Sequence, residues 1–314
     1  MSQFKAVSVN ELLNADLPSQ QWIAFPLIPE KGVSLICSPR GCGKSWLAIS
    51  LAVACASGFD FANFYANKPR KVLYVDGEMS SITLKDRFNK IINGFRQNGK
   101  DVINDNVLLY GNDMQDENAP VLDFAKPESC NQFEIFLETL GKIDLIILDN
   151  IMTLYSFPDE NSSASWQQFN NWCKAQRAKG RSLLWIHHTG KDTGSGARGS
   201  SAIETLMDAS LLLTRPKDYA VNQGSVMNCE YTKSRSVMGD PIESFKLVLK
   251  DVDENSSIFV ADLTDKQKRN SRVIELKRQG CGVDQICQEV GLGKSSVYNI
   301  LKAFNKDSSS TISE

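Results

Sequence analysis

Short apolar runs recur along the first 260 residues of the chain and alternate with longer amphipathic stretches. Each run is rich in Val, Ile and Leu, is too short for a typical helix and is bounded by polar or glycine-containing segments. This pattern indicates strands buried on both faces. Buried strands separated by helices predict an α/β fold in which helices cover both faces of a mostly parallel sheet. The predicted strands are 32–37, 71–75, 106–110, 143–148, 182–187 and 209–213.

The pattern changes in three parts of the chain. Residues 225–233, 245–250 and 256–262 alternate apolar and polar positions, which predicts antiparallel strands that extend the sheet. Residues 112–131 are polar and contain two prolines, so they are predicted to form a loop. Three prolines within residues 1–30 favour an N-terminal segment that lies on the core, and 31–263 is then the main domain.

The last fifty residues predict a small helical domain, 265–306, followed by a disordered Ser-rich tail, 307–314. A first helix is expected over 265–279, and 283–302 has the pattern of a helix-turn-helix, with Gly291 at the turn. This unit resembles the DNA-binding domains of resolvases and invertases; the alternative is a three-helix cap with a structural role only. The candidate DNA contacts at the start of the second helix of the motif are Lys294, Ser295, Ser296, Tyr298 and Asn299.

Composition narrows the function classes. The 314 residues are 42% hydrophobic and 23% charged, as in ordinary globular proteins, and no run approaches the length that spans a bilayer. The N-terminus lacks the apolar stretch of a signal peptide, and the eight cysteines lie in apolar segments without a CxxC pair, so we expect a reducing cytoplasmic location and no membrane partner. Residues 265–314 carry nine Lys and Arg against six Asp and Glu, although the whole chain has net charge −2, which favours a polyanionic partner for the C-terminus.

The strongest chemical signal is Ser-Pro-Arg-Gly-Cys-Gly-Lys-Ser at 38–45, between a predicted strand and a predicted helix. This is the setting of a P-loop, GxxxxGK[ST], with Ser38 in place of the first glycine. Backbone N–H groups of such a loop bind the phosphates of ATP, Lys44 reaches the β- and γ-phosphates, and the Ser45 hydroxyl binds Mg²⁺. The predicted nucleotide contacts are Ser38, Pro39, Arg40, Gly41, Cys42, Gly43, Lys44, Ser45 and Trp46.

Two further strand ends carry carboxylates. Asp149 follows Leu-Ile-Ile-Leu, as in a Walker B motif, and is predicted to hold Mg²⁺. Val-Asp-Gly-Glu at 75–78 ends another strand, and Glu78, in preference to Asp76, is the candidate base for the attacking water. The alternative for these two residues is a solvated turn.

The two histidines of the chain, His187 and His188, are adjacent at a third strand end. Successive strand residues point to opposite faces, which disfavours a shared metal site. We expect one of them, His188, to contact the γ-phosphate or the water, and a buried core histidine is the alternative. The Gly-rich segment that follows contains Lys191 and Arg198, which are candidate phosphate or DNA contacts.

SPRGCGKS, YVDGE, LIILDN, IHHTGK and RGSSA occur in this order, and the set resembles RecA-like ATPases of the plasmid RepA-type hexameric helicase group over residues 20–250. The resemblance implies a RecA-like ATPase domain over 31–263, a hexamer or another ring or filament, and ATP bound between subunits. Lys233 and Arg235 resemble the Lys-x-Arg finger pair of the wider RecA, DnaB and KaiC class, which acts on the neighbouring subunit's nucleotide. Arg198 is a competing candidate, and a solvated basic strand face is the other alternative.

The sequence therefore predicts a DNA-binding ATPase that uses Mg²⁺, hydrolyses ATP to ADP and phosphate, and works as a homo-oligomer. A role in DNA unwinding or replication follows from the resemblance alone. The alternative is an ATP-switched DNA-binding regulator with slow turnover and no unwinding. A P-loop kinase is the weaker third candidate, because the predicted helix-turn-helix would then have no role.

Overall fold

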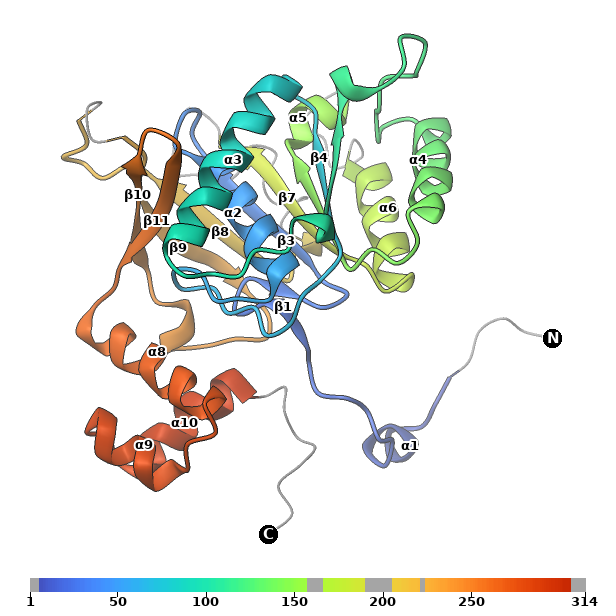
Figure 1. Cartoon of the computed structure of the whole chain (residues 1–314). Helices are drawn as coiled ribbons and strands as arrows, with labels where there is room; N and C mark the ends of the chain where they lie inside the picture. The colour runs from blue at the N-terminus through green and yellow to red at the C-terminus, as the bar shows by residue number, and fades with distance from the viewer. Residues whose placement is uncertain (1–5, 157–165, 190–204, 221–223, 306–314) are drawn as a thin grey trace.

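The computed structural model describes residues 6–156, 166–189, 205–220 and 224–305 (Figure 1). Within these ranges the main body is built on a nine-stranded sheet with the order β11-β10-β9-β8-β3-β7-β6-β4-β5. The strands are β3 (Val33–Ser38), β4 (Val72–Asp76), β5 (Val107–Gly111), β6 (Leu145–Asp149), β7 (Ser182–His188), β8 (Ala209–Thr214), β9 (Val226–Ser234), β10 (Phe245–Asp253) and β11 (Ser256–Asp262).

The parallel half of the sheet runs from β8 to β5 and confirms the six predicted strands to within two residues at each end. Val, Ile and Leu fill these strands because both faces are covered. The register aligns Ser38 with His188 and Asp76 with Asp149, so the polar residues that end these strands lie along one edge of the sheet. We call it the carboxyl edge.

Strands β9, β10 and β11 are antiparallel, as the alternating pattern predicts. Because β9 runs against β8, Ser234 lies opposite Ala209, at the start of β8. The end of β9 is therefore at the amino edge of the parallel strands, opposite the carboxyl edge.

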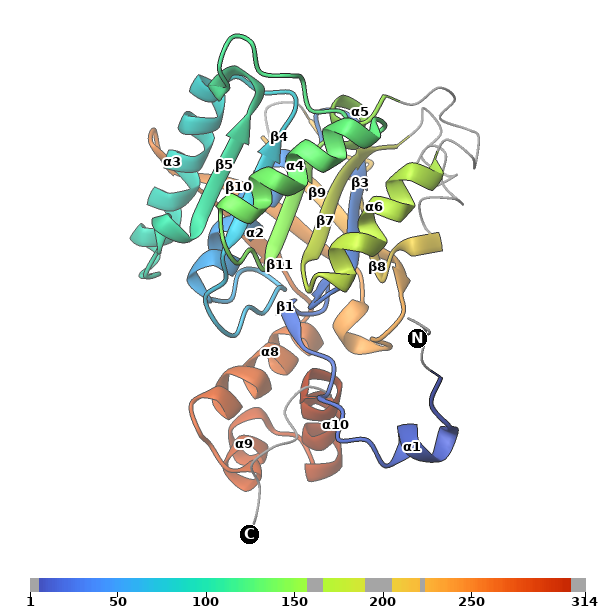
Figure 2. The same cartoon turned by 90° about the vertical axis from the view of Figure 1, so that its right-hand side faces the viewer.

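Helices cover both faces of the sheet (Figures 1 and 2). One face carries α2 (Lys44–Ser57) and α3 (Ser81–Gln97); the other carries α4 (Pro127–Thr139), α5 (Ile151–Leu154) and α6 (Gln167–Ala178). Short 3₁₀ turns lie at Asn104–Asn106, Asn112–Met114 and Asp240–Ile242. The segment 112–131 is a loop over most of its length, but α4 begins inside it at Pro127, a residue that suits the first turn of a helix.

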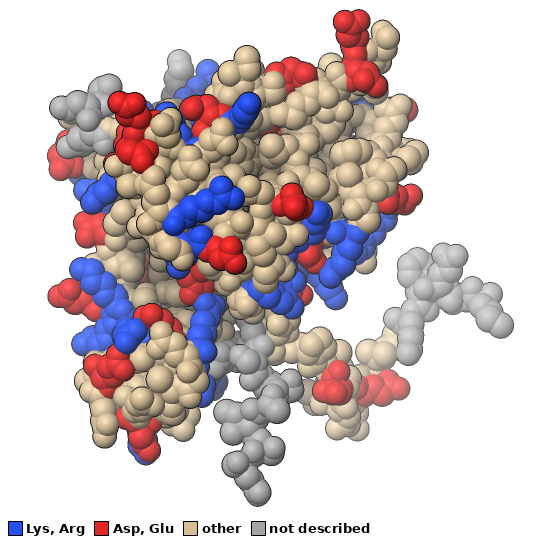
Figure 3. All heavy atoms as spheres, viewed as in Figure 1, with Lys and Arg blue, Asp and Glu red and all other residues tan. Residues whose placement is uncertain are grey.

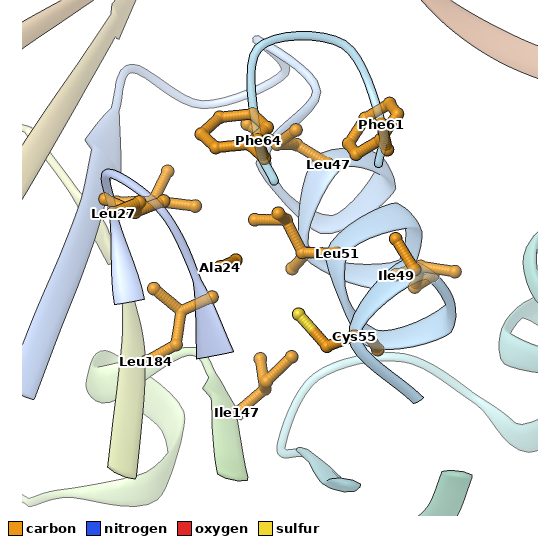
Figure 4. Close-up of a cluster of buried hydrophobic side chains, with 14 of the residues drawn as sticks. Ala24, Leu27, Leu47, Ile49, Leu51, Cys55, Phe61, Phe64, Ile147 and Leu184 are labelled. Carbon is orange, nitrogen blue, oxygen red and sulfur yellow. The ribbon is translucent and has the colours of Figure 1, made fainter. Parts of the chain in front are cut away.

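Helix α2 is almost wholly buried, between the sheet and α3. Leu51 and Cys55 lie on the side of the helix that faces Leu184 and Ile147 of the sheet, and Leu47 lies beside Phe64 (Figure 4). Burying each leucine contributes about 2 kcal/mol, and a reduced cysteine packs here as a small apolar residue. All eight cysteines are free, and six of them are buried. This core fixes the N-terminus of α2, and with it the P-loop, against the carboxyl edge.

Three C-terminal helices form a separate small core: α8 (Asp265–Arg278), α9 (Val283–Val290) and α10 (Lys294–Asn305). Thr264 caps α8 through a reciprocal pair of hydrogen bonds with Gln267, and Gly291 ends α9 with φ +67°. Ile286 and Val297 are fully buried between the helices. Helix α8 covers the first predicted helix, 265–279, to within one residue, and α9 and α10 cover the segment 283–302, with α10 extending to Asn305.

The C-terminal helices lie against the main body at the amino edge (Figures 1 and 2). Phe304 packs edge-on against Phe25 and Tyr65, with ring centroids 5.4 and 5.6 Å apart, and Ile274 joins the same cluster. No pattern in the sequence predicts this contact.

The N-terminal segment only partly lies on the core. The hairpin of β1 (Trp22–Ala24) and β2 (Ile28–Pro29) is buried, whereas α1 (Val9–Leu13) contains no buried residue. The predicted tail, 307–314, lies outside the described residues. Within the described ranges, no helix combines the length and apolarity needed to cross a membrane.

Candidate functional site

The P-loop joins β3 to α2 and has the backbone that its glycines permit. Gly41 and Gly43 have φ +73° and +103°, a region that residues with a side chain rarely adopt. A Cβ on Gly43 would lie 2.1 Å from the Ser225 Oγ. Ser38 is the last residue of β3 and has no positive φ, so serine is accepted in place of the usual first glycine.

Lys44 opens α2, and its ammonium turns back over the loop. The Lys44 Nζ donates to the carbonyls of Ser38 and Pro39, at 3.4 and 3.3 Å, and lies 2.9 Å from the His188 Nδ1. Burial lowers the pKa of Lys44, and the nearby carboxylates of Asp149 and Glu78 oppose this shift. The lysine is thus held at the point where the α2 N-terminus and the loop amides converge, as phosphate binding requires.

Asp149 and Ser45 supply hard oxygen atoms beside Lys44. Burial raises the pKa of Asp149, while hydrogen bonds from Tyr74 and Ser45 lower it; the Tyr74 Oη lies 2.7 Å from the Asp149 Oδ2. The described residues contain no cluster of three His, Cys, Asp or Glu side chains that could hold a metal alone. A hydroxyl and one carboxylate fit Mg²⁺, which usually takes its other ligands from phosphates and water.

Glu78 lies after β4 at the mouth of the same site and is held by a neighbour. The Asn150 Nδ2 donates to the Glu78 Oε2 at 2.5 Å, and Asn150 itself caps α5 through the Met152 N–H. Asp76 accepts hydrogen bonds from the backbone N–H groups of Glu78 and Met79 and so shapes the turn that presents Glu78. The solvated-turn alternative is therefore wrong for Asp76, which is 1% exposed.

The two histidines separate as strand alternation predicts. His187 is fully buried beside the Trp166 ring, whereas His188 faces Lys44. Burial and the charges of Lys44 and Arg40 lower the pKa of His188 to about 4, so its ring is neutral at pH 7. Because an ammonium only donates, the Nδ1 accepts from Lys44 and the Nε2 carries the hydrogen. That Nε2 lies 3.5 Å from the Asn150 Nδ2, on the side of Glu78.

These side chains surround one cavity of about 460 Å³. Of the predicted nucleotide contacts, six line it: Arg40, Gly41, Gly43, Lys44, Ser45 and Trp46. The side chain of Cys42 instead packs into the hydrophobic core, and Ser38 is fully buried, so these two could contribute only backbone atoms. Pro39 contributes its carbonyl to Lys44.

Several residues that line or adjoin this cavity escaped sequence reasoning. Arg87 of α3 lies over the Trp46 ring, 5.2 Å from its centroid. Arg215 donates to the Gly41 carbonyl at 2.9 Å and stacks on Tyr219 at 4.5 Å, and Tyr219 lines the cavity. Asn150 and Arg215 follow strands that end at the carboxyl edge, so the reasoning that found Asp149 could have found both. Arg87 and Tyr219 carry no comparable signal.

The candidate finger residues lie away from this cavity. Lys233 pairs with Ser210 near the start of β8, and Arg235 lies 3.6 Å from Asp208 at the amino edge. A six-residue parallel strand such as β3 is about 20 Å long, so neither residue can act on the P-loop of its own chain.

The candidate DNA contacts have different surroundings. Lys191 and Arg198 lie outside the described residues. On α10, Lys294 pairs with Asp284, Ser295 is exposed and Tyr298 is 57% exposed. Ser296 and Asn299 line a cavity of about 440 Å³ between the C-terminal helices and the main body.

Comparisons with known proteins bear on the family and the fold of the chain. A search of curated proteins finds no match. Among solved structures, a KaiC-like protein of the hyperthermophilic archaeon Pyrococcus horikoshii OT3 is similar, with a TM-score of 0.50 and 12% identity over 74% of this chain and 93% of that chain. This likeness shows that the α/β fold is RecA-like. A family model described as "AAA domain" matches residues 1–194, a span that includes the P-loop, Glu78, Asp149 and both histidines. The chain therefore belongs to the AAA domain family, as a P-loop ATPase with a RecA-like fold.

Proposed function

We propose that this protein is a DNA-binding ATPase that hydrolyses ATP in an oligomer and uses its C-terminal helices to contact DNA. One observation carries the hydrolytic part: Lys44, Ser45, Asp149, Glu78 and His188 come from four segments and line a single cavity. Lys44 binds phosphate, Ser45 and Asp149 offer oxygen ligands for a cation, Glu78 is a carboxylate base, and neutral His188 is a hydrogen-bond donor.

The residues divide the reaction between them. Loop amides and Lys44 hold the β- and γ-phosphates, and Ser45 and Asp149 would hold Mg²⁺, which neutralises phosphate charge when bound. Glu78, oriented by Asn150, accepts the proton of a water as its oxygen attacks the γ-phosphorus and the bond to the β–γ bridging oxygen breaks. The Nε2–H of neutral His188 donates to the water or to a γ-phosphate oxygen.

A phosphate-release assay tests this mechanism. Glu78→Gln keeps the size of the side chain and removes the base, so ATP binding should persist while kcat falls about 10²–10⁴-fold. Lys44→Ala should lose nucleotide binding or turnover. Glu138→Gln, an exposed glutamate on α4, is the matched control and should behave like wild type. Normal turnover in Glu78→Gln would remove Glu78 from this role.

The DNA-dependent part needs separate measurements. ATPase rates with single- and double-stranded DNA should exceed the rate without DNA, and a strand-displacement assay tests the helicase role that the resemblance implies. An ATPase rate that no DNA changes would contradict DNA-dependent hydrolysis.

One observation favours the second candidate, an ATP-switched regulator. Ser296 and Asn299 of α10 face the main body across a cavity, and Phe304 of the same helix packs against Phe25. Both side chains are exposed, but they share this cavity with residues of the main body, so DNA that contacts them would compete with the docking of α10. Sequence-specific duplex binding that needs residues 265–305, combined with negligible hydrolysis, would favour this candidate.

A further inference from the structure

A third cavity, of about 380 Å³, opens at the amino edge of the sheet, where β6 and β7 begin. It shares no lining residue with the P-loop cavity. None of the residues that were assigned to ATP binding or hydrolysis lines it, and six of its lining residues carry a positive charge. The basic residues that line it are Lys31, Lys68, Arg70, Lys142, Lys179 and Arg181.

Two of these cations are rigidly placed. Arg70 and Arg181 are only 7% and 11% exposed. The Arg70 guanidinium is paired with Glu30, and the Arg181 Nη1 lies 2.5 Å from the Glu134 Oε1. Fixed guanidinium groups of this kind suit oxyanions such as phosphate, because two N–H groups can donate to two oxygen atoms and little side-chain freedom is lost on binding.

The four lysines form an exposed rim around them, and Lys31 is one of these. Lys142, Lys68 and Lys179 are 86%, 55% and 45% exposed. Their partners are shared or already occupied: Glu30 also pairs with Arg70, Glu134 also pairs with Arg181, and Asp144 also accepts the Lys71 N–H. Six cations thus face three carboxylates, Glu30, Asp144 and Glu134, which leaves an excess of three positive charges around one hollow.

We propose that this cavity binds phosphate groups, and specifically the phosphodiester backbone of a nucleic acid. Its position supports this choice. Arg70 donates to the Trp22 carbonyl, Trp22 packs on Phe25, and Phe25 contacts Phe304 of α10, so the cavity lies close to the C-terminal helices. Lys and Arg side chains gather along the lower margin of the main body, above those helices (Figure 3).

The same chemistry could serve a free phosphate, but the rim favours a chain of phosphates. Its lysines come from four separate segments, around residues 31, 68, 142 and 179, and the cavity contains no glycine-rich loop at a helix N-terminus like the one at Lys44. A nucleic-acid strand held here would continue the contact expected for α10. In this respect the inference rests on the proposed function.

The test replaces two exposed rim lysines, Lys68 and Lys142. Lys68→Gln with Lys142→Gln removes two charges without touching the buried arginines, and Lys85→Gln with Lys250→Gln removes two exposed charges elsewhere as the matched control. Affinity for a fluorescein-labelled single-stranded oligonucleotide is measured by anisotropy between 50 and 200 mM salt. We expect about 5–10-fold weaker binding and a salt slope smaller by about 1.4 in the cavity variant only. Circular dichroism and thermal melting check that both variants fold.

Two parallel measurements separate the possible outcomes. Calorimetry with inorganic phosphate at constant ionic strength tests whether the cavity binds free phosphate instead. If the cavity variant alone loses phosphate binding and keeps its affinity for the oligonucleotide, the nucleic-acid assignment is overturned. Equal oligonucleotide affinity in the cavity and control variants, with no phosphate binding, would overturn the site altogether. Tyr298→Ala on α10 tests the proposed function independently: if it has no effect while the cavity variant binds weakly, the cavity contact stands and the helical contact fails.

Discussion

Asp76 is a single buried residue that shapes the carboxyl edge of the sheet. Its Oδ1 accepts two backbone N–H groups, and among the described residues its Oδ2 has no hydrogen-bond partner. Burial, together with the neighbouring Asp149 carboxylate, raises the pKa of Asp76 to about 7, against the effect of those two N–H groups. The chain therefore keeps a carboxyl where its ionisation is unfavourable, which indicates a role in holding the turn before Glu78.

The sign of the pH dependence follows from this shift. Between the ordinary value of 3.8 and about 7, native Asp76 stays protonated while the unfolded chain loses this proton, so its contribution to stability falls as pH rises through that window. Asp76→Asn keeps the acceptor and cannot ionise. Its free energy of unfolding relative to wild type should rise by about 1–4 kcal/mol from pH 4 to pH 8, as measured by urea denaturation. Asp86→Asn, an exposed control on α3, should show no such trend; a parallel trend in both variants would contradict the assignment.

At the scale of elements, continuous apolar runs predicted the parallel strands, because a strand that is buried on both faces needs apolar side chains at nearly every position. The strand ends then brought Ser38, Asp149 and His188 to one edge, as the register confirms. What the pattern could not supply depends on loops and on contacts distant in sequence. Tyr219 enters the cavity from an irregular segment, and the Phe25–Phe304 contact joins opposite ends of the chain.

The docking of α10 leads to an element-scale prediction. Phe304→Ala removes an aromatic ring that packs on Phe25 and Tyr65 and lies under the Arg278 guanidinium, which should weaken docking by about 1–3 kcal/mol. Limited proteolysis should then cut faster near the junction at 263–265, and duplex DNA should bind more tightly because α10 is released. Phe136→Ala, which truncates a partly buried aromatic residue of α4, is the control. Unchanged cleavage with unchanged affinity would show that docking does not restrain α10.

For the whole molecule, the distribution of charge around the two edges of the sheet is the informative feature. The carboxyl edge gathers the P-loop, three carboxylates and His188, whereas Lys233 and Arg235 lie at the amino edge, too far away to complete the site of their own chain. A transition-state charge on the γ-phosphate needs a cation close by. If either residue is the finger, the site is completed only by a second copy of the chain.

Mixing two inactive variants tests this arrangement. Arg235→Ala should bind ATP but hydrolyse it poorly, and Lys44→Ala has no working P-loop; mixed in equal amounts, they should regain activity at about one quarter of the subunit contacts, where an intact P-loop meets an intact Arg235. Arg177→Ala is the matched control, because Arg177 also pairs with Asp208, at 3.5 Å, and its loss should leave hydrolysis near the wild-type rate. Mass photometry of the same samples confirms that mixed oligomers form. Persistent inactivity in mixed oligomers would assign Arg235 to the structural ion pair with Asp208 and move the search for the finger to Lys233 or Arg198.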